Sequence, residues 1–422
     1  MARASAELLA LQREVEARAR DAGLPVPEIV YEVVDHRELN AIAALGGFPV
    51  RYAHWRFGME YDRLQKGHAW GLQRIYELVV NTRPVLAYLL RHNAPVEQKL
   101  VMAHVCGHAD FFRANAWFAH TDRSMLDVMA AHAARVRELS AAHGQDALEG
   151  FIDRVLSLDN LVDPGALRLA CGHPGNAPPL DGRLAPGDVL GHVLRDAPLP
   201  DWQREVLALL RDEACYFLPQ MLTKVMNEGW ASFWHSRLMT GSLLRDAEVV
   251  DYACQHSGAM GGSDGPMNPY KLGLELFRHV HARSGGSLHA VFDARAVHDD
   301  LTFVDAFADE DFCRVHGLGS TSDEIAAARE GLLAALTNGG QPVIRRLPAG
   351  GRELELEHVW SGQELQLDQA EETLRNLCAL WQGPVRLHTR LDNRALLLSA
   401  GPAGVTREFG EALPGQHPPR PG

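Results

Sequence analysis

The sequence predicts a mainly α-helical protein with a smaller α+β domain at its C-terminal end. Apolar residues recur at helical spacing through most of the first 290 residues. Beyond residue 340 they alternate in short segments, as in strands, and Gly- and Pro-rich stretches interrupt both patterns. We therefore expect a helical domain over 1–290 with a loop-like excursion at 172–200, an α+β domain over 291–400, and a disordered tail at 401–422.

The bulk composition is typical of a soluble globular protein, with 46% hydrophobic and 23% charged residues among 422. A net charge of −13 argues against nucleic acid or an anionic membrane as the main partner. The first 24 residues mix charged and apolar positions, which predicts an amphipathic helix and not a signal peptide. No segment reaches the roughly 18 apolar residues of a membrane span. Six scattered cysteines without a CxxC pair suit a reduced compartment, so we expect a cytoplasmic protein.

Within the first domain, the pattern is helical from about residue 60 to about 145. The segment 60–80 carries apolar residues at helical spacing, a break follows at Asn81 to Pro84, and 96–118 resumes the pattern. A further helical block runs from about 201 to about 244. In the second domain, two helical stretches precede the alternating segments QPVIRRL, RELELEHVW, PVRLHTR and RALLLSA. The turn sequences PAGG, SGQ and LDN between these segments suit hairpins.

Two motifs predict a metal site. His104 and His108 lie four residues apart, so on a helix both imidazoles face the same side and can bind one cation. Glu228, in the segment NEGWASFWH, can supply a third ligand if its helix packs against the first. His235 follows Glu228 by seven residues, about 10 Å along the helix axis. We therefore expect His235 to contact substrate or to support a ligand and not to bind the same ion.

The expected metal site lacks the glutamate that acts as general base in many zinc peptidases. Val105 follows His104 where a zinc peptidase of the HExxH type has its general base. The remaining candidate bases are Glu97, Asp110, His120, Glu60 and Glu213, and the candidates for stabilising an oxyanion are His235 and Arg56. An isolated HxxxH pair is more often a pair of surface or capping histidines than a metal site. The metal prediction therefore rests on both motifs occurring in one helical domain.

Six longer segments carry a family resemblance: GGFPVRYAHWRFGMEYDRL, VVNTRPVLAYLLRHN, EQKLVMAHVCGHADFF, WFAHTDRSMLDVM, YFLPQMLTKVMNEGWASFWHSRLM and NPYKLGLELF. Together they resemble the SpoVR family (stage V sporulation protein R and its relatives in non-sporulating bacteria) from about residue 20 to about 400. The family usually has a tyrosine at the position of Cys106, which argues against a ligand role for this thiol. The two metal motifs are also similar, more loosely, to the ligand-bearing helices of gluzincin aminopeptidases.

The resemblance implies a link to spore-cortex formation, cell-wall or stress physiology. It also implies two protein partners, a PrkA-type serine protein kinase and a von Willebrand-like protein. Two functions follow as hypotheses. The first is a metal-dependent hydrolase acting on an amide bond of a peptide or small molecule, with zinc as the expected ion and Fe or Mn as alternatives. The second is a non-catalytic regulatory or scaffold protein that acts with the kinase and keeps a structural metal.

Overall fold

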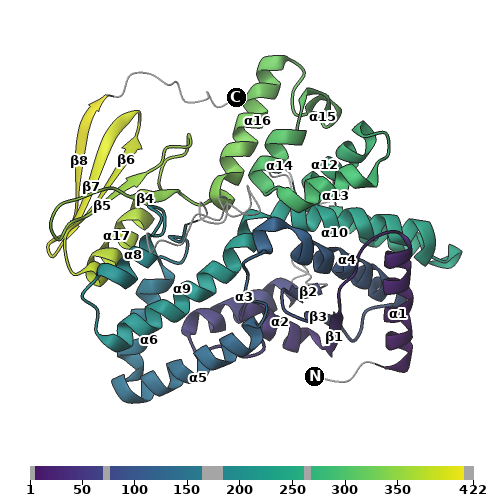
Figure 1. Ribbon diagram of the computed structural model, residues 1–422, viewed down its shortest axis with the longest axis horizontal. Coiled ribbons are helices and arrows are strands. Elements are labelled where there is room, and N and C mark those ends of the chain that lie inside the picture. Colours follow the sequence, from purple (N-terminus) through teal and green to yellow (C-terminus); the bar gives the residue numbers. More distant parts are fainter. Residues whose placement is uncertain (1–4, 70–76, 164–183, 261–267, 413–422) are drawn as a thin grey trace. The chain divides into compact units, whose positions relative to one another are not determined.

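The computed structural model describes residues 5–69, 77–163, 184–260 and 268–412. The described chain is mainly helical and has a small five-stranded sheet in its C-terminal part (Figure 1), as the sequence predicts. The chain divides into two compact units, each formed from two separate stretches of sequence. Unit 1 contains residues 1–135 and 223–308. Unit 2 contains residues 136–222 and 309–422.

This division differs from the predicted boundary at residue 290. The helical segment 136–222 belongs with the C-terminal sheet and not with the first helical stretch. Within unit 2, for example, α17 (Leu367–Trp381) packs against both α6 (Gln145–Leu156) and α8 (Val189–Asp196). Composition and periodicity identify helices, but they do not reveal which apolar face meets which, so the contacts between distant segments could not be predicted.

Unit 1 contains a three-stranded sheet that the sequence analysis did not predict. Its strands are β1 (Ile29–Val34), β2 (Glu77–Val80) and β3 (Val85–Leu90), in the order β1-β3-β2. β1 is parallel to β3, and β2 is antiparallel to β3. The predicted helix over 60–80 is correct for α3 (Trp55–Ala69) but wrong for 77–80, because pairing with β3 overrides the local pattern. Residues 70–76 lie outside the described part.

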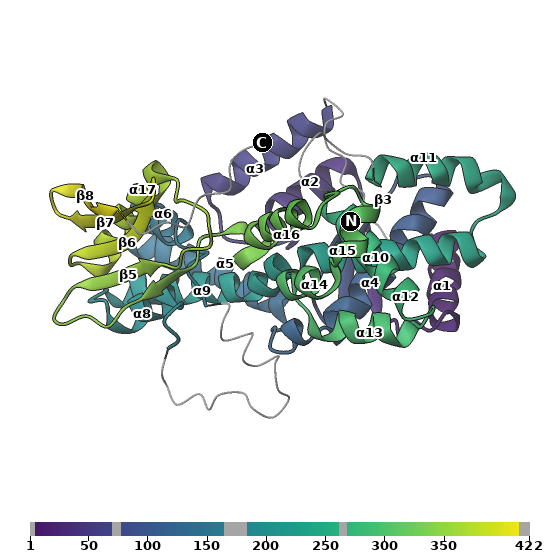
Figure 2. The same ribbon diagram turned by 90° about the horizontal axis from the view of Figure 1, so that it is seen from above.

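Three helices form the centre of unit 1. α4 (Pro95–Ala114) is buried on almost every face, packs against α10 (Lys224–Leu238), and α10 in turn packs against α12 (Pro269–Arg283) (Figure 1 and Figure 2). A helix that is apolar all round requires such a buried position. The remaining helices of the unit are α1 (Ala6–Asp21), α2 (His36–Ala44), α3, α11 (Val249–Met260), α13 (Leu288–Val297) and α14 (Asp300–Phe307).

Unit 2 joins helices to the five-stranded sheet. The strands β4 to β8 lie in the sheet in the same order as in the chain. Each strand is antiparallel to its neighbour except that β5 and β6 are parallel, and α17 connects these two. Alternate residues such as Leu356, Leu387 and Leu398 are buried. The strands are β4 (Ile344–Arg346), β5 (Leu354–His358), β6 (Val385–Leu391), β7 (Arg394–Gly401) and β8 (Gly404–Ala412).

Helices and short turns complete the described chain. The other helices of unit 2 are α9 (Asp201–Leu222), α15 (Glu310–Val315) and α16 (Ser322–Leu336), and α5 (Met125–His143) crosses the sequence boundary between the units. The short turns are η1 (Ala116–Phe118), η2 (Met239–Leu243), η3 (Asp246–Glu248) and η4 (Thr337–Gly340). Among the described helices, none combines the length and the apolar character that crossing a bilayer demands.

Two predicted irregular segments are partly ordered. The predicted disordered tail at 401–422 contains β8, which pairs along β7, so that prediction is wrong for 404–412. Residues 413–422 lie outside the described part. The predicted excursion at 172–200 contains α8, whose apolar residues Val189, Leu190 and Val193 are buried. Both errors have one cause: Gly and Pro nearby suggested loops, whereas contacts with distant segments stabilise the strand and the helix. Residues 172–183 are outside the described part.

Candidate metal centre

Helix α4 presents two histidines to the interior of unit 1. The ring centroids of His104 and His108 lie 4.6 Å apart, and only 3% and 5% of their surfaces are exposed. The helix begins at Pro95, whose fixed φ suits the first helical position. Glu97 caps this end, since its carboxylate accepts a hydrogen bond of 2.7 Å from the Ala94 N–H. The two imidazoles therefore lie on the same face of α4, as expected. The carboxylate of Glu97, a candidate base, caps the N-terminus of the helix.

Helix α10 brings Glu228 to these imidazoles. The Oε2 atom of Glu228 lies 3.4 Å from His104 Nε2 and 3.5 Å from His108 Nε2. The side chain of Glu228 is 18% exposed, whereas those of the histidines are 4% and 6% exposed, so the carboxylate side of the cluster is the more open one. The three residues predicted as ligands from two distant motifs thus converge on one point.

A remote carboxylate sets the start of α10. Thr223 precedes the helix but its side chain makes no capping hydrogen bond. Instead the backbone N–H groups of Val225 and Met226 each donate to the Asp300 carboxylate at 2.8 Å. Burial raises the pKa of Asp300 to about 8, although these two hydrogen bonds act in the opposite direction. The N-terminus of a helix attracts an acidic group. Because Asp300 belongs to α14, its contact holds the first turn of α10, the helix that carries Glu228, against α14.

A second carboxylate, from strand β2, completes the cluster. Glu77 Oε1 lies 3.1 Å from His104 Nε2. One ligand atom from each of Glu77, His104, His108 and Glu228 lies within 4.8 Å of the other three. Two imidazole nitrogens and two carboxylate oxygens form a donor set that suits zinc and other first-row divalent ions.

Glycines allow the ligand-bearing helices to approach closely. A Cβ atom at Gly107 would lie 2.6 Å from the Ala231 Cα, and one at Gly229 would lie 2.3 Å from the Gly273 carbonyl carbon. Real Cβ atoms do not reach such distances, so α4, α10 and α12 meet backbone to backbone. Gly107 precedes a histidine ligand and Gly229 follows Glu228. The absence of these side chains therefore determines how near the ligands come.

The outer nitrogens of both histidines have partners. His108 Nδ1 lies 2.9 Å from Asn227 Oδ1, and His104 Nδ1 lies 2.8 Å from His235 Nδ1. An Asn oxygen can only accept, so Nδ1 of His108 is the donor in this contact and Nε2 is the nitrogen that faces Glu228. Such contacts fix the tautomer and the ring orientation of histidine ligands. His235 thus lies beside His104 and outside the group of four, and its role in supporting a ligand stays a prediction.

The electrostatic environment favours a cation. Burial and the neighbouring His108 lower the pKa of His104 to about 4, so this imidazole is neutral at pH 7, the form that binds metals. Burial and the charge of Glu228 raise the pKa of Glu77. Burial alone would raise the pKa of Glu228, but the two histidines lower it overall. Two carboxylates this close repel each other, and a divalent ion between them would offset that repulsion.

The other predicted catalytic residues lie outside this group of four. Asp110 is fully buried, accepts a hydrogen bond of 3.1 Å from Trp230 Nε1 and lies 3.5 Å from Arg295 Nη1. Burial raises the pKa of Asp110 to about 6. His120 is exposed after η1, and Arg56 is exposed on α3. The other two base candidates are elsewhere: Glu60 pairs with Arg63, and Glu213 belongs to unit 2.

Glu77 was not predicted as part of the site, and Tyr270 was not predicted to lie near it. Glu77 stands in a segment read as helical, and no local signal links a short Glu-Leu-Val-Val strand to a histidine pair 27 residues later. Tyr270, in the family-like segment NPYKLGLELF, lies near the cluster, with its ring centroid 6.5 Å from that of His104. Cys106 is buried against Tyr31, as expected for a thiol without a ligand role. His256, in the segment CQHSGAM before a glycine-rich loop, is a further possible ligand from the sequence, and its side chain lies outside the described residues.

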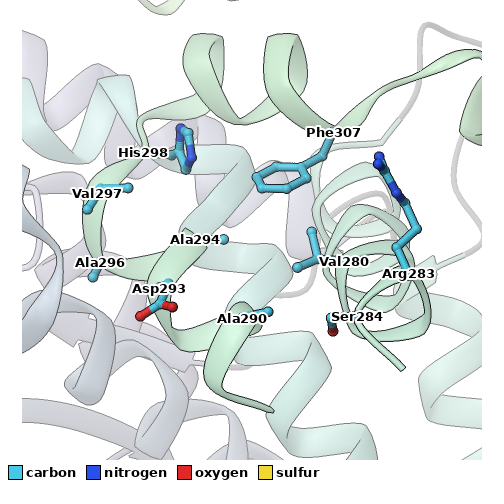
Figure 3. A pocket seen from close by; sticks show the side chains of 10 residues that line it. All are labelled: Val280, Arg283, Ser284, Ala290, Asp293, Ala294, Ala296, Val297, His298 and Phe307. Carbon is cyan, nitrogen blue, oxygen red and sulfur yellow. The ribbon is translucent and has the colours of Figure 1, made fainter. Parts of the chain in front are cut away.

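A separate hollow of about 570 Å³ lies at the far end of α12. Figure 3 shows Val280, Ala294, Val297 and Phe307 around it, with His298 at one side. None of the four residues of the metal cluster lines this hollow. The hollow is therefore distinct from the candidate metal centre.

The fold and the cluster define a mainly helical protein with a two-histidine, two-glutamate site. The family model described as "SpoVR like protein" matches residues 3–171 and 183–330, and the model described as "SpoVR-like C-terminal domain" matches residues 346–392. The chain therefore belongs to the SpoVR family. The match to the C-terminal model covers β5, α17 and β6.

The chain is also similar to a curated protein. The chain is 29% identical over 301 residues to "Uncharacterized protein YcgB" from Escherichia coli (strain K12). This alignment covers 59% of the chain and 58% of the relative's length. No solved structure gives a significant match to the chain.

Proposed function

We propose that this SpoVR protein binds one divalent metal ion through His104, His108 and Glu228 and uses it to hydrolyse an amide bond. The observation that carries this proposal is the convergence of four ligand atoms from α4, α10 and β2 within 4.8 Å of one another. Zinc is the expected ion, because neutral imidazoles and a carboxylate are its usual catalytic ligands. Iron and manganese accept the same donors.

Glu77 is suited to the role that Val105 leaves vacant. Val105 is fully buried and cannot accept a proton. The Glu77 carboxylate stands beside the expected ligands, at 3.1 Å from His104 Nε2, and is 18% exposed. In hydrolysis Glu77 would take a proton from the attacking water, whose oxygen adds to the amide carbon. The same carboxyl group would then return the proton to the leaving amine as the C–N bond breaks.

The substrate class and the partners rest on the family alone. We propose peptides or cell-wall precursors as substrates, and the cytoplasm as the place of action. A PrkA-type serine protein kinase and a von Willebrand-like protein are the proposed partners. Arg56 and His120 have no part in this mechanism, because both are exposed and neither is in the cluster.

A second function is favoured by the same four residues. If Glu77 is a fourth ligand and not a base, the ion has four protein ligands and no position for substrate, as in structural zinc sites. The metal would then tie β2, α4 and α10 together, and the protein would act as a regulatory or scaffold partner of the kinase. The number of exchangeable positions on the ion therefore separates the two functions.

The test is metal analysis of the purified protein followed by substitution with Co²⁺. We expect one ion per chain in the unsubstituted protein, loss of most of it in His104→Ala and His108→Ala, and no loss in His132→Ala, a buried histidine outside the cluster. Acetohydroxamate should change the visible spectrum of the Co²⁺ protein if a position is open. Absence of stoichiometric metal would refute the proposal, and a spectrum unaffected by acetohydroxamate would leave the structural alternative.

A further inference from the structure

Helix α10 contacts both ring nitrogens of His104. On one side of the ring, Glu228 Oε2 lies 3.4 Å from His104 Nε2. On the other side, His235 Nδ1 lies 2.8 Å from His104 Nδ1, and the two ring centroids are 5.0 Å apart. Both imidazoles are only 3% exposed, so the contact between them is shielded from bulk water. The His104 ring is therefore held between two residues of one helix.

The position of His235 follows from the close contact between α10 and α4. Glu228 and His235 are seven residues apart and therefore face the same side of α10. Ala231 lies between them in the sequence, and a Cβ atom at Gly107 would be 2.6 Å from the Ala231 Cα. His104 precedes Gly107 by three residues and shares its side of α4. The backbone contact therefore brings the His104 ring between Glu228 and His235.

The two histidine ligands differ in the partner of their Nδ1 atom. The partner of His108 Nδ1 is Asn227 Oδ1 at 2.9 Å, and an amide oxygen can only accept a hydrogen bond. The partner of His104 Nδ1 is an imidazole nitrogen, which accepts in one tautomer of His235 and donates in the other. The tautomer of His104 therefore depends on the tautomer of His235.

The carboxylates of the cluster favour the tautomer of His104 that cannot bind a metal. Glu77 Oε1 lies 3.1 Å from His104 Nε2, a distance at which an Nε2–H would donate to the carboxylate. A nitrogen that carries a proton has no lone pair for a cation, so a histidine that binds through Nε2 needs its proton on Nδ1. That proton requires an acceptor, and His235 Nδ1 lies within hydrogen-bond distance of it. Metal binding by His104 therefore depends on an acceptor at the position of His235 Nδ1.

We propose that His235 is a positioning residue that accepts the Nδ1 proton of His104 and so keeps the Nε2 lone pair of His104 directed at the cluster. His235 acts through His104 and does not bind the ion. The position of the proton follows from the contact between the two imidazoles, whereas its consequence for the metal rests on the proposed function.

Two substitutions of His235 separate the acceptor from the bulk of the ring. His235→Asn keeps an oxygen near the position of Nδ1, which accepts as Asn227 does beside His108. His235→Phe keeps a ring and removes the acceptor. His132→Phe is the control, because His132 is a buried histidine outside the cluster.

The first measurement needs no metal. Long-range ¹H–¹⁵N spectra of the metal-free, histidine-labelled protein show which nitrogen of each imidazole carries the proton, and His104→Ala identifies the signals of His104. We expect the proton on Nδ1 in the unsubstituted protein and in His235→Asn. In His235→Phe we expect it on Nε2, because the Glu77 carboxylate is then the better acceptor. A proton on Nε2 in the unsubstituted protein, or on Nδ1 in His235→Phe, would overturn the inference.

The second measurement is the Co²⁺ affinity, obtained from competition with a chelator. Loss of the group that orients a histidine ligand typically lowers metal affinity about 10- to 100-fold. We expect such a loss in His235→Phe and an unchanged affinity in His235→Asn and His132→Phe. Equal affinities in His235→Phe and His235→Asn would refute the role of His235 at the metal. If the unsubstituted protein binds no Co²⁺, the proposed function fails, while the spectra of the metal-free protein still decide where the His104 proton lies.

Discussion

Gly107 in α4 lies directly against the backbone of Ala231 in α10, so that a Cβ atom at Gly107 would be 2.6 Å from the Ala231 Cα. Gly107 immediately precedes His108, and Ala231 lies three residues after Glu228. The distance between the imidazole and the carboxylate therefore depends on this contact. Two helices that meet backbone to backbone bring ligands from distant parts of the sequence within reach of one ion.

Gly107→Ala is expected to force α4 and α10 apart. Adding a methyl group to a closely packed interior typically costs about 1–3 kcal/mol, and the shift should also reduce the bound metal. Urea unfolding and metal analysis measure the two effects. Gly58→Ala is the control, because no atom lies within 4 Å of a Cβ at Gly58 and alanine favours a helix by roughly 0.5–1 kcal/mol. Unchanged stability and metal content in Gly107→Ala would contradict the role of this contact.

Bound metal should stabilise the folded protein. An ion that binds only the folded state at about 100 times its Kd adds about 2.7 kcal/mol to the free energy of unfolding. We expect Zn²⁺ to raise the unfolding temperature of the chelator-treated protein and to have no such effect on His108→Ala. His132→Ala should respond like the unsubstituted protein. An equal rise in His108→Ala would mean that the ion binds elsewhere.

The Asp300 cap on α10 predicts a pH dependence of stability. Because the pKa of Asp300 is raised to about 8 in the folded state, the folded protein binds this proton more tightly than the unfolded chain does. The stability from this group is complete below its ordinary pKa of about 4 and is lost as the pH rises through about 8. The slope reaches at most about 1.4 kcal/mol per pH unit.

Asp300→Asn should remove this pH dependence, because the amide cannot ionise. Its single oxygen replaces only one of the two oxygens that accept the N–H groups of Val225 and Met226, so a loss of stability that does not vary with pH is also expected. The measurement is urea unfolding of the metal-free proteins from about pH 5 to about pH 8. The difference between the unsubstituted protein and the variant isolates Asp300 from other titrating groups. A difference that stays constant over this range would show that the carboxyl group has an ordinary pKa.

The hydrogen bond between Trp230 and Asp110 should stabilise the contact between α10 and α4. Trp230→Phe leaves Asp110 without the donor at 3.1 Å, and an unsatisfied buried group typically costs about 1–3 kcal/mol. Trp234→Phe is the matched control, because Trp234 is equally buried and its Nε1 finds no acceptor among the described residues. Chemical denaturation measures both variants. Equal losses would assign the effect to ring size alone.

The C-terminal sheet should affect stability without affecting the metal. Leu398 on β7 is fully buried, and Leu398→Ala is expected to cost about 2–5 kcal/mol in the unfolding of unit 2. Leu397→Ala, on the opposite face of the same strand, should cost less because Leu397 is half-buried. Metal content should stay at one ion per chain in both variants, since all four cluster residues belong to unit 1. Loss of metal in Leu398→Ala would contradict this separation.

Local sequence patterns were sufficient to predict several features of the fold and of the candidate site. Helical spacing placed His104 and His108 on one face of α4, and the same spacing put His235 outside the group of four. The turn at Asp392 and Asn393, both with positive φ, joins β6 and β7 as the LDN signal predicted. These features depend on residues only a few positions apart, where backbone geometry alone relates the side chains.

Other features depend on residues far apart in the chain. Glu77 reaches His104 because the segment 77–80 pairs with β3 as strand β2, although its own pattern looked helical. Asp300 reaches the start of α10 through helix packing that composition does not encode. The amino-acid sequence alone was therefore sufficient to identify the histidine pair, Glu228 in α10 and the protein family. The second carboxylate, the Asp300 cap on α10 and the two-unit division arose from packing, because non-local burial and strand pairing outweigh the local preferences that periodicity reveals.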